Sequence, residues 1–187
     1  MTLVRGWVKF RRLDLALLVT VVSIALIWLR SRSSLSIPFL PAPVPIPVFM
    51  LLTLAALPCV ILADRLGPLG QSFPGARRER LLAVTLTVAA ALAPFVLLWA
   101  RGHGDPSPEV GVLIVTVAVV AATLLGPNAW VLAMGFAAVS VGVDLMLPSR
   151  PVSSAAAVIP AWGHVIALGA VCLNYVWRGP RTWEDEA

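Results

Sequence analysis

Long runs of apolar residues, separated by short polar or proline-rich connections, dominate the pattern along this chain. A helix needs about 20 mostly apolar residues to cross the hydrocarbon layer of a bilayer. Runs near that length lie at residues 13–30, 46–63, 81–100, 110–125, 129–147 and 158–177. We therefore predict an all-α fold, a polytopic transmembrane helical bundle of about six spans whose backbone hydrogen bonds are satisfied within each helix.

The shortest connection, Gly126, Pro127 and Asn128, separates the fourth run from the fifth. Proline and asparagine favour turns, so we expect a tight helical hairpin here. One uninterrupted helix is the alternative, but it would be far longer than the bilayer is thick. Pro58 and Pro94 lie inside the second and third runs, where each removes a backbone N–H and favours a kink.

A proline-rich connection, residues 31–47, joins the first two runs. Its prolines are Pro38, Pro41, Pro43, Pro45 and Pro47. Such spacing cannot sustain a helix and favours an extended, stiff chain. Because Ile37, Phe39 and Leu40 are apolar, we expect the segment to pack on the outer mouth of the bundle. Two roles stay open for it, a rigid connector and a lid over an outward-facing cavity.

Residues 1–12 precede the first run and have an amphipathic pattern. In a helix, one face would carry Leu3, Val4, Trp7 and Val8, and another would carry Arg5, Lys9 and Arg12. This pattern predicts a short interfacial helix in the inner headgroup layer. The residues expected at that membrane interface are Trp7, Lys9, Arg11 and Arg12. The alternative is an unstructured basic leader that only fixes topology.

The composition agrees with a membrane protein, because 59% of the residues are apolar and only 12% are charged. A soluble domain of this size could not cover so much apolar surface with so little charge. The first run has no convincing small-residue cleavage site, so we interpret it as a retained span. Cys59 and Cys172 both fall inside apolar runs, which argues against a disulfide framework.

The basic residues predict the orientation of the spans. If the N-terminus is cytoplasmic, ten of the fourteen lysine and arginine residues lie inside: Arg5, Lys9, Arg11, Arg12, Arg65, Arg77, Arg78, Arg80, Arg178 and Arg181. The outside set is then Arg30, Arg32, Arg101 and Arg150. The positive-inside rule favours this N-in/C-in arrangement in a plasma membrane, with 178–187 as a cytoplasmic tail. Because the basic residues lie between the runs, their charge indicates no nucleic-acid partner.

Candidate chemistry is sparse. His103 lies in an outer loop near Asp105 and Glu109, and His164 lies inside the sixth run, but no spacing typical of a metal site is present. The chain has neither a G-x-x-x-x-G-K-[ST] motif nor a G-x-S-x-G motif. We therefore expect no catalytic, metal-binding or cofactor-binding residues in this chain.

Two polar residues within the runs are candidate functional residues. Asp144 lies near the outer end of the fifth run, and an intramembrane carboxylate is a functional hypothesis because burying its charge is costly. A local structural role near water or Arg150 is one interpretation, and contact with a substrate or proton is the other. Asn174, in the sixth run, is expected to hydrogen-bond between helices. In the fifth run, Gly135 and Gly142 would allow close approach of another helix or a second copy.

Several stretches are similar to a known family in their order along the chain. They are Trp7 to Arg12, Asp64-Arg65-Leu66-Gly67, Phe73-Pro74-Gly75-Ala76-Arg77-Arg78, and Pro148 to Trp162 with its Ile159-Pro160-Ala161-Trp162. This layout resembles the membrane subunits of ATP-binding-cassette exporters of the drug, lipid and polysaccharide export type. Those subunits have an interfacial elbow helix, six spans, a cytoplasmic loop that contacts the ATPase, and a re-entrant hairpin before span six.

The resemblance implies a permease subunit of an ATP-driven exporter of an amphipathic small molecule or peptide. Any ATP hydrolysis would reside on a separate cytoplasmic nucleotide-binding subunit, and the membrane chains would form a homo- or hetero-oligomer. The loop 65–80 would contact the ATPase, with Asp64, Arg65, Arg77, Arg78 and Arg80 as its coupling residues. A solvated basic loop that only sets topology is the alternative.

Two other functions stay open. A non-catalytic accessory or structural subunit of a larger membrane complex is favoured by the shortage of polar residues within the runs, since a solute path normally needs some polar lining. A substrate-binding subunit of a vitamin-type importer would have a similar size and six spans. However, few polar groups are present to hold a polar vitamin.

Overall fold

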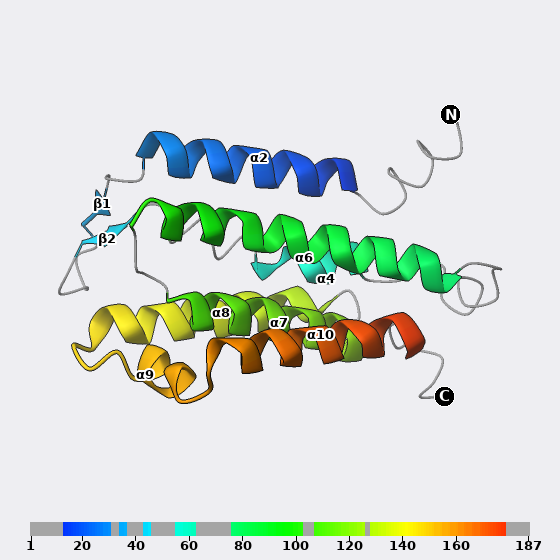
Figure 1. The fold of residues 1–187 in the computed structure, drawn as a ribbon. Coiled ribbons are helices and arrows are strands. Elements are labelled where there is room, and N and C mark those ends of the chain that lie inside the picture. Colours follow the sequence, from blue (N-terminus) through cyan, green and yellow to red (C-terminus); the bar gives the residue numbers. More distant parts are fainter. Residues whose placement is uncertain are drawn as a thin grey trace.

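The computed structural model describes residues 13–30, 34–36, 43–45, 55–62, 76–102, 107–125 and 128–178. Within these ranges the helices are α2 (Leu13–Arg30), α4 (Leu57–Leu62), α6 (Ala76–Ala100), α7 (Pro108–Leu125), α8 (Ala129–Met146), α9 (Pro151–Ala157) and α10 (Ala161–Arg178). The strands are β1 (Ser34–Leu35) and β2 (Val44–Pro45). The long helices lie along a common axis (Figure 1). The predicted all-helical class is therefore confirmed.

Three helices are long and apolar enough to cross a bilayer: α6, α7 and α8. The pair α9 and α10 would count as a fourth if it is one span, although its two parts meet at an angle of 85°. Helix α2 is apolar from Leu17 to Leu29. Within the described ranges, three to four candidate spans fit a membrane-embedded protein. The count of six and the N-in/C-in orientation stay predictions.

Helix α7 lies at the centre of the bundle and packs against α4, α6, α8, α9 and α10. Small residues let the neighbouring helices approach it closely, among them Ala118 and Ala122, which are fully buried. Gly111 marks the tightest approach. A Cβ atom there would lie 2.8 Å from Cδ1 of Phe95 and 2.9 Å from Cζ2 of Trp99 on α6. Helix α7 and helix α6 can therefore pack here only because residue 111 has no side chain.

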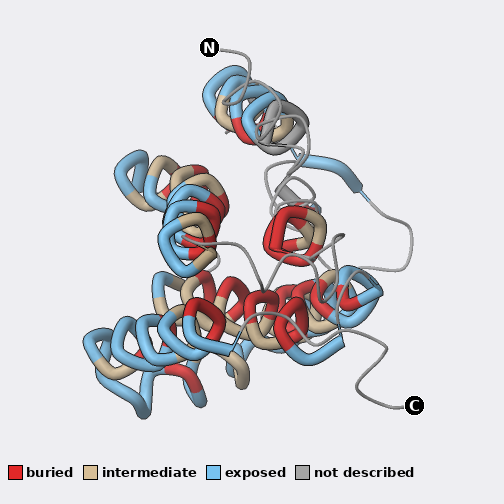
Figure 2. Tube along the Cα trace, turned by 90° about the vertical axis from the view of Figure 1, so that its right-hand side faces the viewer, coloured by how far each residue is buried: buried red, intermediate tan, exposed pale blue. Residues whose placement is uncertain are grey.

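Helix α2 lies at the edge of the bundle and packs mainly on α6 (Figure 2). It buries Thr20, Ser23 and Ile27, which are spaced so that they share one helical face. Most of its other described side chains are exposed and apolar, for example Leu18 and Val21. The outer faces of α8 and α10 are likewise apolar, and in water such surfaces would be costly. These faces suit contact with lipid.

The described part of the proline-rich connection is extended. Strands β1 and β2 are antiparallel, and Leu35 pairs with Val44. Val44 is 4% exposed and belongs to a buried cluster with Val110 and Ile114 of α7 and Val141 of α8. The segment thus contacts the bundle through Val44. Ile37, Phe39 and Leu40 lie outside the described residues, as do most of residues 46–63.

The predicted runs agree with the helices to different degrees. Helix α7 ends at Leu125, and helix α8 begins at Ala129. The two helices pack against each other, as a tight hairpin requires. Helix α6 instead begins at Ala76, not at residue 81, because alanine and arginine are good helix formers and Glu79 lies in its favourable first turn. Residues 76–80 of the predicted loop therefore belong to α6.

The start of the sixth run contains a bend, which a single span over 158–177 does not include. The bend lies within Pro148 to Trp162, the stretch for which the resemblance implies a re-entrant hairpin, and that hairpin stays a prediction. Helix α9 ends at Ala157, and α10 starts only at Ala161, directly after Pro160. Proline restricts the residue before it to an extended conformation, which separates the two helices. By contrast, Pro94 lies inside α6, which is helical from Ala76 to Ala100.

Candidate functional site

Asp144 holds the N-terminus of the short helix α9. Its Oδ1 accepts a hydrogen bond from the backbone N–H of Val152 at 2.8 Å, and its Oδ2 accepts one from the N–H of Ser153 at 2.9 Å. The Ser153 hydroxyl also donates to Oδ2. The first backbone N–H groups of a helix have no partner inside the helix, and a carboxylate there also matches the positive end of the helix dipole. Asp144 therefore caps a neighbouring helix from α8.

His164 holds the other end of α9. Its Nε2 lies 2.9 Å from the carbonyl oxygen of Ala156, and the imidazole is buried. A carbonyl oxygen can only accept, so Nε2 carries the hydrogen and donates it. Ala156 is in the last turn of α9, and its carbonyl oxygen also accepts a hydrogen bond from the backbone N–H of Ile159 at 3.1 Å, so His164 is a second donor to it.

Asp144 of the fifth run and His164 of the sixth run thus both hydrogen-bond to the short helix α9. Asp144 satisfies the start of α9 and His164 satisfies its end, which stabilises the 85° turn into α10. Of the two interpretations of Asp144, this geometry matches the local structural role. Asn174 is exposed on α10, and its predicted hydrogen bond between helices stays a prediction.

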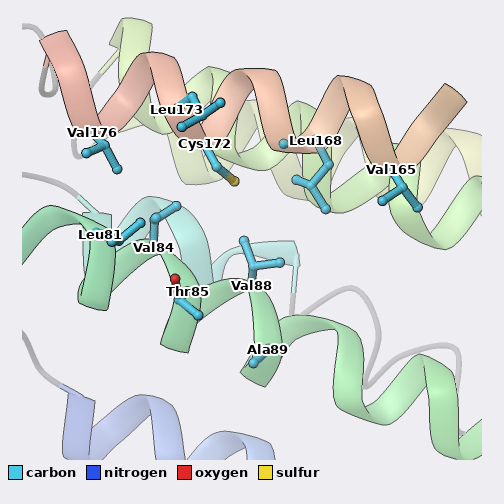
Figure 3. A pocket seen from close by; sticks show the side chains of 11 residues that line it. Leu81, Val84, Thr85, Val88, Ala89, Val165, Leu168, Cys172, Leu173 and Val176 are labelled. Carbon is cyan, nitrogen blue, oxygen red and sulfur yellow. The ribbon is translucent and has the colours of Figure 1, made fainter. Parts of the chain in front are cut away.

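An apolar groove lies between α6 and α10 and has a volume of about 400 Å³ (Figure 3). The α6 wall consists of Leu81, Val84, Thr85, Val88 and Ala89. The α10 wall consists of Val165, Leu168, Gly169, Cys172, Leu173 and Val176. The side chains of the two helices point toward one another across it, and Thr85 supplies the hydroxyl in its lining.

Arginines lie just beyond one end of this groove. Arg77 and Arg78, in the first turn of α6, are exposed, and the Arg77 guanidinium carbon lies 4.5 Å from the centroid of the Trp177 ring on α10. At the opposite end of α6, the guanidinium carbon of Arg101 lies 5.3 Å from the Trp28 ring centroid. Pairs of tryptophan and a cation at both ends of a bundle are typical of the two interfaces of a bilayer.

Of the residues predicted to couple to an ATPase, the structure describes Arg77, Arg78 and Arg80, and these three differ in exposure. Arg77 and Arg78 are exposed, but Arg80 is only 6% exposed and is not available to a partner. Arg78 and Arg80 are two positions apart, and residues at that spacing project from different sides of a helix, so Arg80 points toward the bundle while Arg78 does not. Asp64 and Arg65 lie outside the described residues, as do the interface residues Trp7, Lys9, Arg11 and Arg12.

Both cysteines are free. Cys59 of α4 is buried, with Sγ 3.5 Å from the carbonyl oxygen of Ala118, and Cys172 lines the groove. A second long-range bond joins α10 to α4, from the Tyr175 hydroxyl to the carbonyl oxygen of Leu62 at 2.8 Å. Within the described ranges, no three histidine, cysteine or acidic side chains are grouped as metal ligands.

The fold and these sites together define a class: an all-helical chain whose apolar helices fit a membrane-embedded protein, with a lateral apolar groove. Comparison of the chain with known protein families, with curated proteins and with solved structures finds no match. The groove and the bond from His164 were not predicted, because both depend on how helices distant in sequence face each other.

Proposed function

We propose that this chain is a membrane-spanning permease subunit of an ATP-driven exporter of an amphipathic small molecule or peptide. It would work with a separate cytoplasmic ATPase subunit in an oligomer of membrane chains in the plasma membrane. The observation that carries the proposal is the continuity of α6. This single helix runs from the exposed Arg77 and Arg78 into one wall of the groove.

A continuous helix can transmit a displacement from a partner to a ligand site. Arg78 lies one turn from Leu81, the first groove residue of α6, so the two positions move as one rigid unit. A partner that contacts Arg78 would therefore shift the α6 wall relative to α10. A shear of packed helices of this kind is a common way to open and close a site.

The groove suits an amphipathic ligand better than a polar one. Its lining is almost entirely apolar, and it lies between helices whose outer faces suit lipid. A ligand could enter it sideways from the bilayer without first crossing water. In the proposal, the arginine-bearing end of α6 faces the cytoplasm, in keeping with the N-in/C-in arrangement of six spans and the positive-inside rule.

Copurification tests this function. The full-length chain, cross-linked in its own membranes and then solubilised, is expected to recover a subunit with a P-loop ATPase motif. Arg78→Glu should weaken that association, because it reverses the charge of an exposed residue at the proposed contact. Arg101→Glu, at the opposite end of the same helix, is the matched control and should leave association unchanged.

Two results would contradict the proposal. One is the absence of any ATPase after cross-linking, and the other is equal recovery of the ATPase with wild type and Arg78→Glu. Arg80 is not substituted, because it is buried, and a substitution there would also destabilise the fold, so that lost association could not be assigned to a lost contact.

A second candidate is a non-transporting structural subunit of a larger membrane complex. It is favoured by the open face of α8, where a Cβ atom at Gly135 or Gly142 would meet no other atom within 4 Å. Small residues on a lipid-facing helix permit close packing of another helix. For this candidate, Gly135→Leu should release the chain from its complex, whereas Gly169→Leu in the groove should not. For the exporter, Gly135→Leu should leave the association with the ATPase unchanged, whereas Gly169→Leu should impair transport by filling the groove.

A further inference from the structure

The groove between α6 and α10 has one charged end, and this asymmetry indicates its ligand. Arg77 precedes Leu81 by four residues, and Arg78 precedes Thr85 by seven. Residues at these spacings share a face of a helix. Both arginines therefore lie on the face of α6 that lines the groove, just beyond its end. Glu79, two residues after Arg77, projects from a different side of the helix.

The length of the groove matches half of a bilayer. It extends along α6 from Leu81 to Ala89. At a rise of 1.5 Å per residue these eight steps span about 12 Å. One leaflet contributes about half of a hydrocarbon core of roughly 30 Å. The groove is thus about as deep as one leaflet, and its charged end coincides with the depth of that leaflet's headgroups.

The geometry of Arg77 suits an anionic headgroup. The guanidinium stacks on the Trp177 ring, with its carbon 4.5 Å from the ring centroid. Stacking uses the face of the guanidinium and leaves its N–H edge able to donate two parallel hydrogen bonds to a phosphate. Arg78, which is exposed on the same face, adds a second cation. A phosphate at this place would be held by charge and by directed hydrogen bonds.

We infer that the groove binds one acyl chain of an anionic phospholipid, with the phosphate held by Arg77 and Arg78. The inference deepens the proposed function, because it names the chemistry of the amphipathic ligand. Binding itself needs no ATPase. The apolar lining supplies the attraction for the chain, and the two arginines supply the preference for a negatively charged lipid.

Lipid binding to the purified full-length chain tests the inference. The chain is stripped of lipid in detergent, titrated with phosphatidylglycerol or phosphatidylcholine, and analysed by native mass spectrometry. Wild type is expected to retain one phosphatidylglycerol with an affinity about tenfold above that for phosphatidylcholine, a ratio typical of one charge-assisted contact. Arg78→Gln should lower this preference, because it weakens phosphatidylglycerol binding more than binding of phosphatidylcholine, whose choline cation offsets the charge of its phosphate.

Gly169→Leu tests the apolar part of the site. Residue 169 lines the groove, and a Cβ atom there would meet nothing within 4 Å, so the side chain of a leucine would start in open space and occupy part of the groove. We expect phosphatidylglycerol binding to weaken at least about tenfold. Gly135→Leu, on the equally open face of α8, is the matched control and should bind as wild type does.

Equal lipid retention by wild type, Gly169→Leu and Arg78→Gln would overturn the inference. So would a dimer that Gly169→Leu converts to a monomer without a change in bound lipid, because the groove would then be covered by a second copy. The proposed function fails separately. Selective phosphatidylglycerol binding without any recovered ATPase would support this inference and contradict the exporter. A recovered ATPase with equal lipid retention by all variants would do the opposite.

Discussion

Removal of the Asp144 carboxylate is the sharpest test of how this fold is held together. Asp144→Ala would leave the backbone N–H groups of Val152 and Ser153 without the acceptors that they have at 2.8 and 2.9 Å. A hydrogen bond to a charged group contributes about 1.5–3 kcal/mol. Because the site is only partly buried, we take the lower end for each of the two bonds, and expect a loss of about 3 kcal/mol in the free energy of unfolding.

The loss can be measured by equilibrium unfolding in mixed micelles and located by hydrogen exchange. Amide protection should fall across Pro151–Ala157 and stay unchanged in α7, which does not depend on the cap. Asp144→Asn keeps one acceptor oxygen but turns an amide donor toward the other N–H. Asp144→Asn should therefore lower the free energy of unfolding by about half as much as Asp144→Ala, roughly 1–2 kcal/mol.

Two results would refute this reasoning. One is a change below about 0.5 kcal/mol for Asp144→Ala, which is the range of an ordinary surface substitution. The other is full additivity with His164→Phe. Asp144 and His164 bind opposite ends of the same short helix, so once one end is released, the bond at the other end contributes less to the free energy of unfolding. The double variant should therefore lose less stability than the sum of the losses of the two single variants.

Three further outcomes are expected in the same unfolding assay. Thr20→Val should raise stability by about 1 kcal/mol, because the buried Thr20 hydroxyl has no hydrogen-bond partner among the described residues; a loss would contradict this. Gly111→Leu should cost at least about 3 kcal/mol through its clash with α6, whereas Gly135→Leu should change stability by less than about 0.5 kcal/mol. Tyr175→Phe should cost about 1–2 kcal/mol, because the buried Leu62 carbonyl loses its donor, and an unchanged midpoint would contradict this.

The apolar runs predicted the central helices well because length and hydropathy alone decide whether a segment suits the bilayer. Runs 110–125 and 129–147 correspond to α7 (Pro108–Leu125) and α8 (Ala129–Met146). Helix α6 starts before its apolar run. Arginines interrupt a hydropathy pattern, but they do not interrupt a helix, because residues such as Arg77 and Arg78 are good helix formers.

The contacts of the candidate sites could be predicted only in part. The sequence marked Asp144 as unusual and left its role open between structure and substrate; its contacts with Val152 and Ser153 depend on a short helix folding back at residues 148–150. The groove depends on which faces of α6 and α10 meet, and residues such as Thr85 and Gly169 carry no sequence signal of that pairing. Periodicity identifies a helix but not its neighbour.

The peripheral position of α2 has a consequence for how the protein is made. Its main packing partner, α6, follows it along the chain, and ribosomes add about 5–20 residues per second. From Arg30 to Ala100, translation therefore takes roughly 4–14 s. During that interval α2 lacks its main packing partner, and its exposed apolar face has to be covered by something other than α6. Assembly then depends on α6 packing against an α2 that was made earlier.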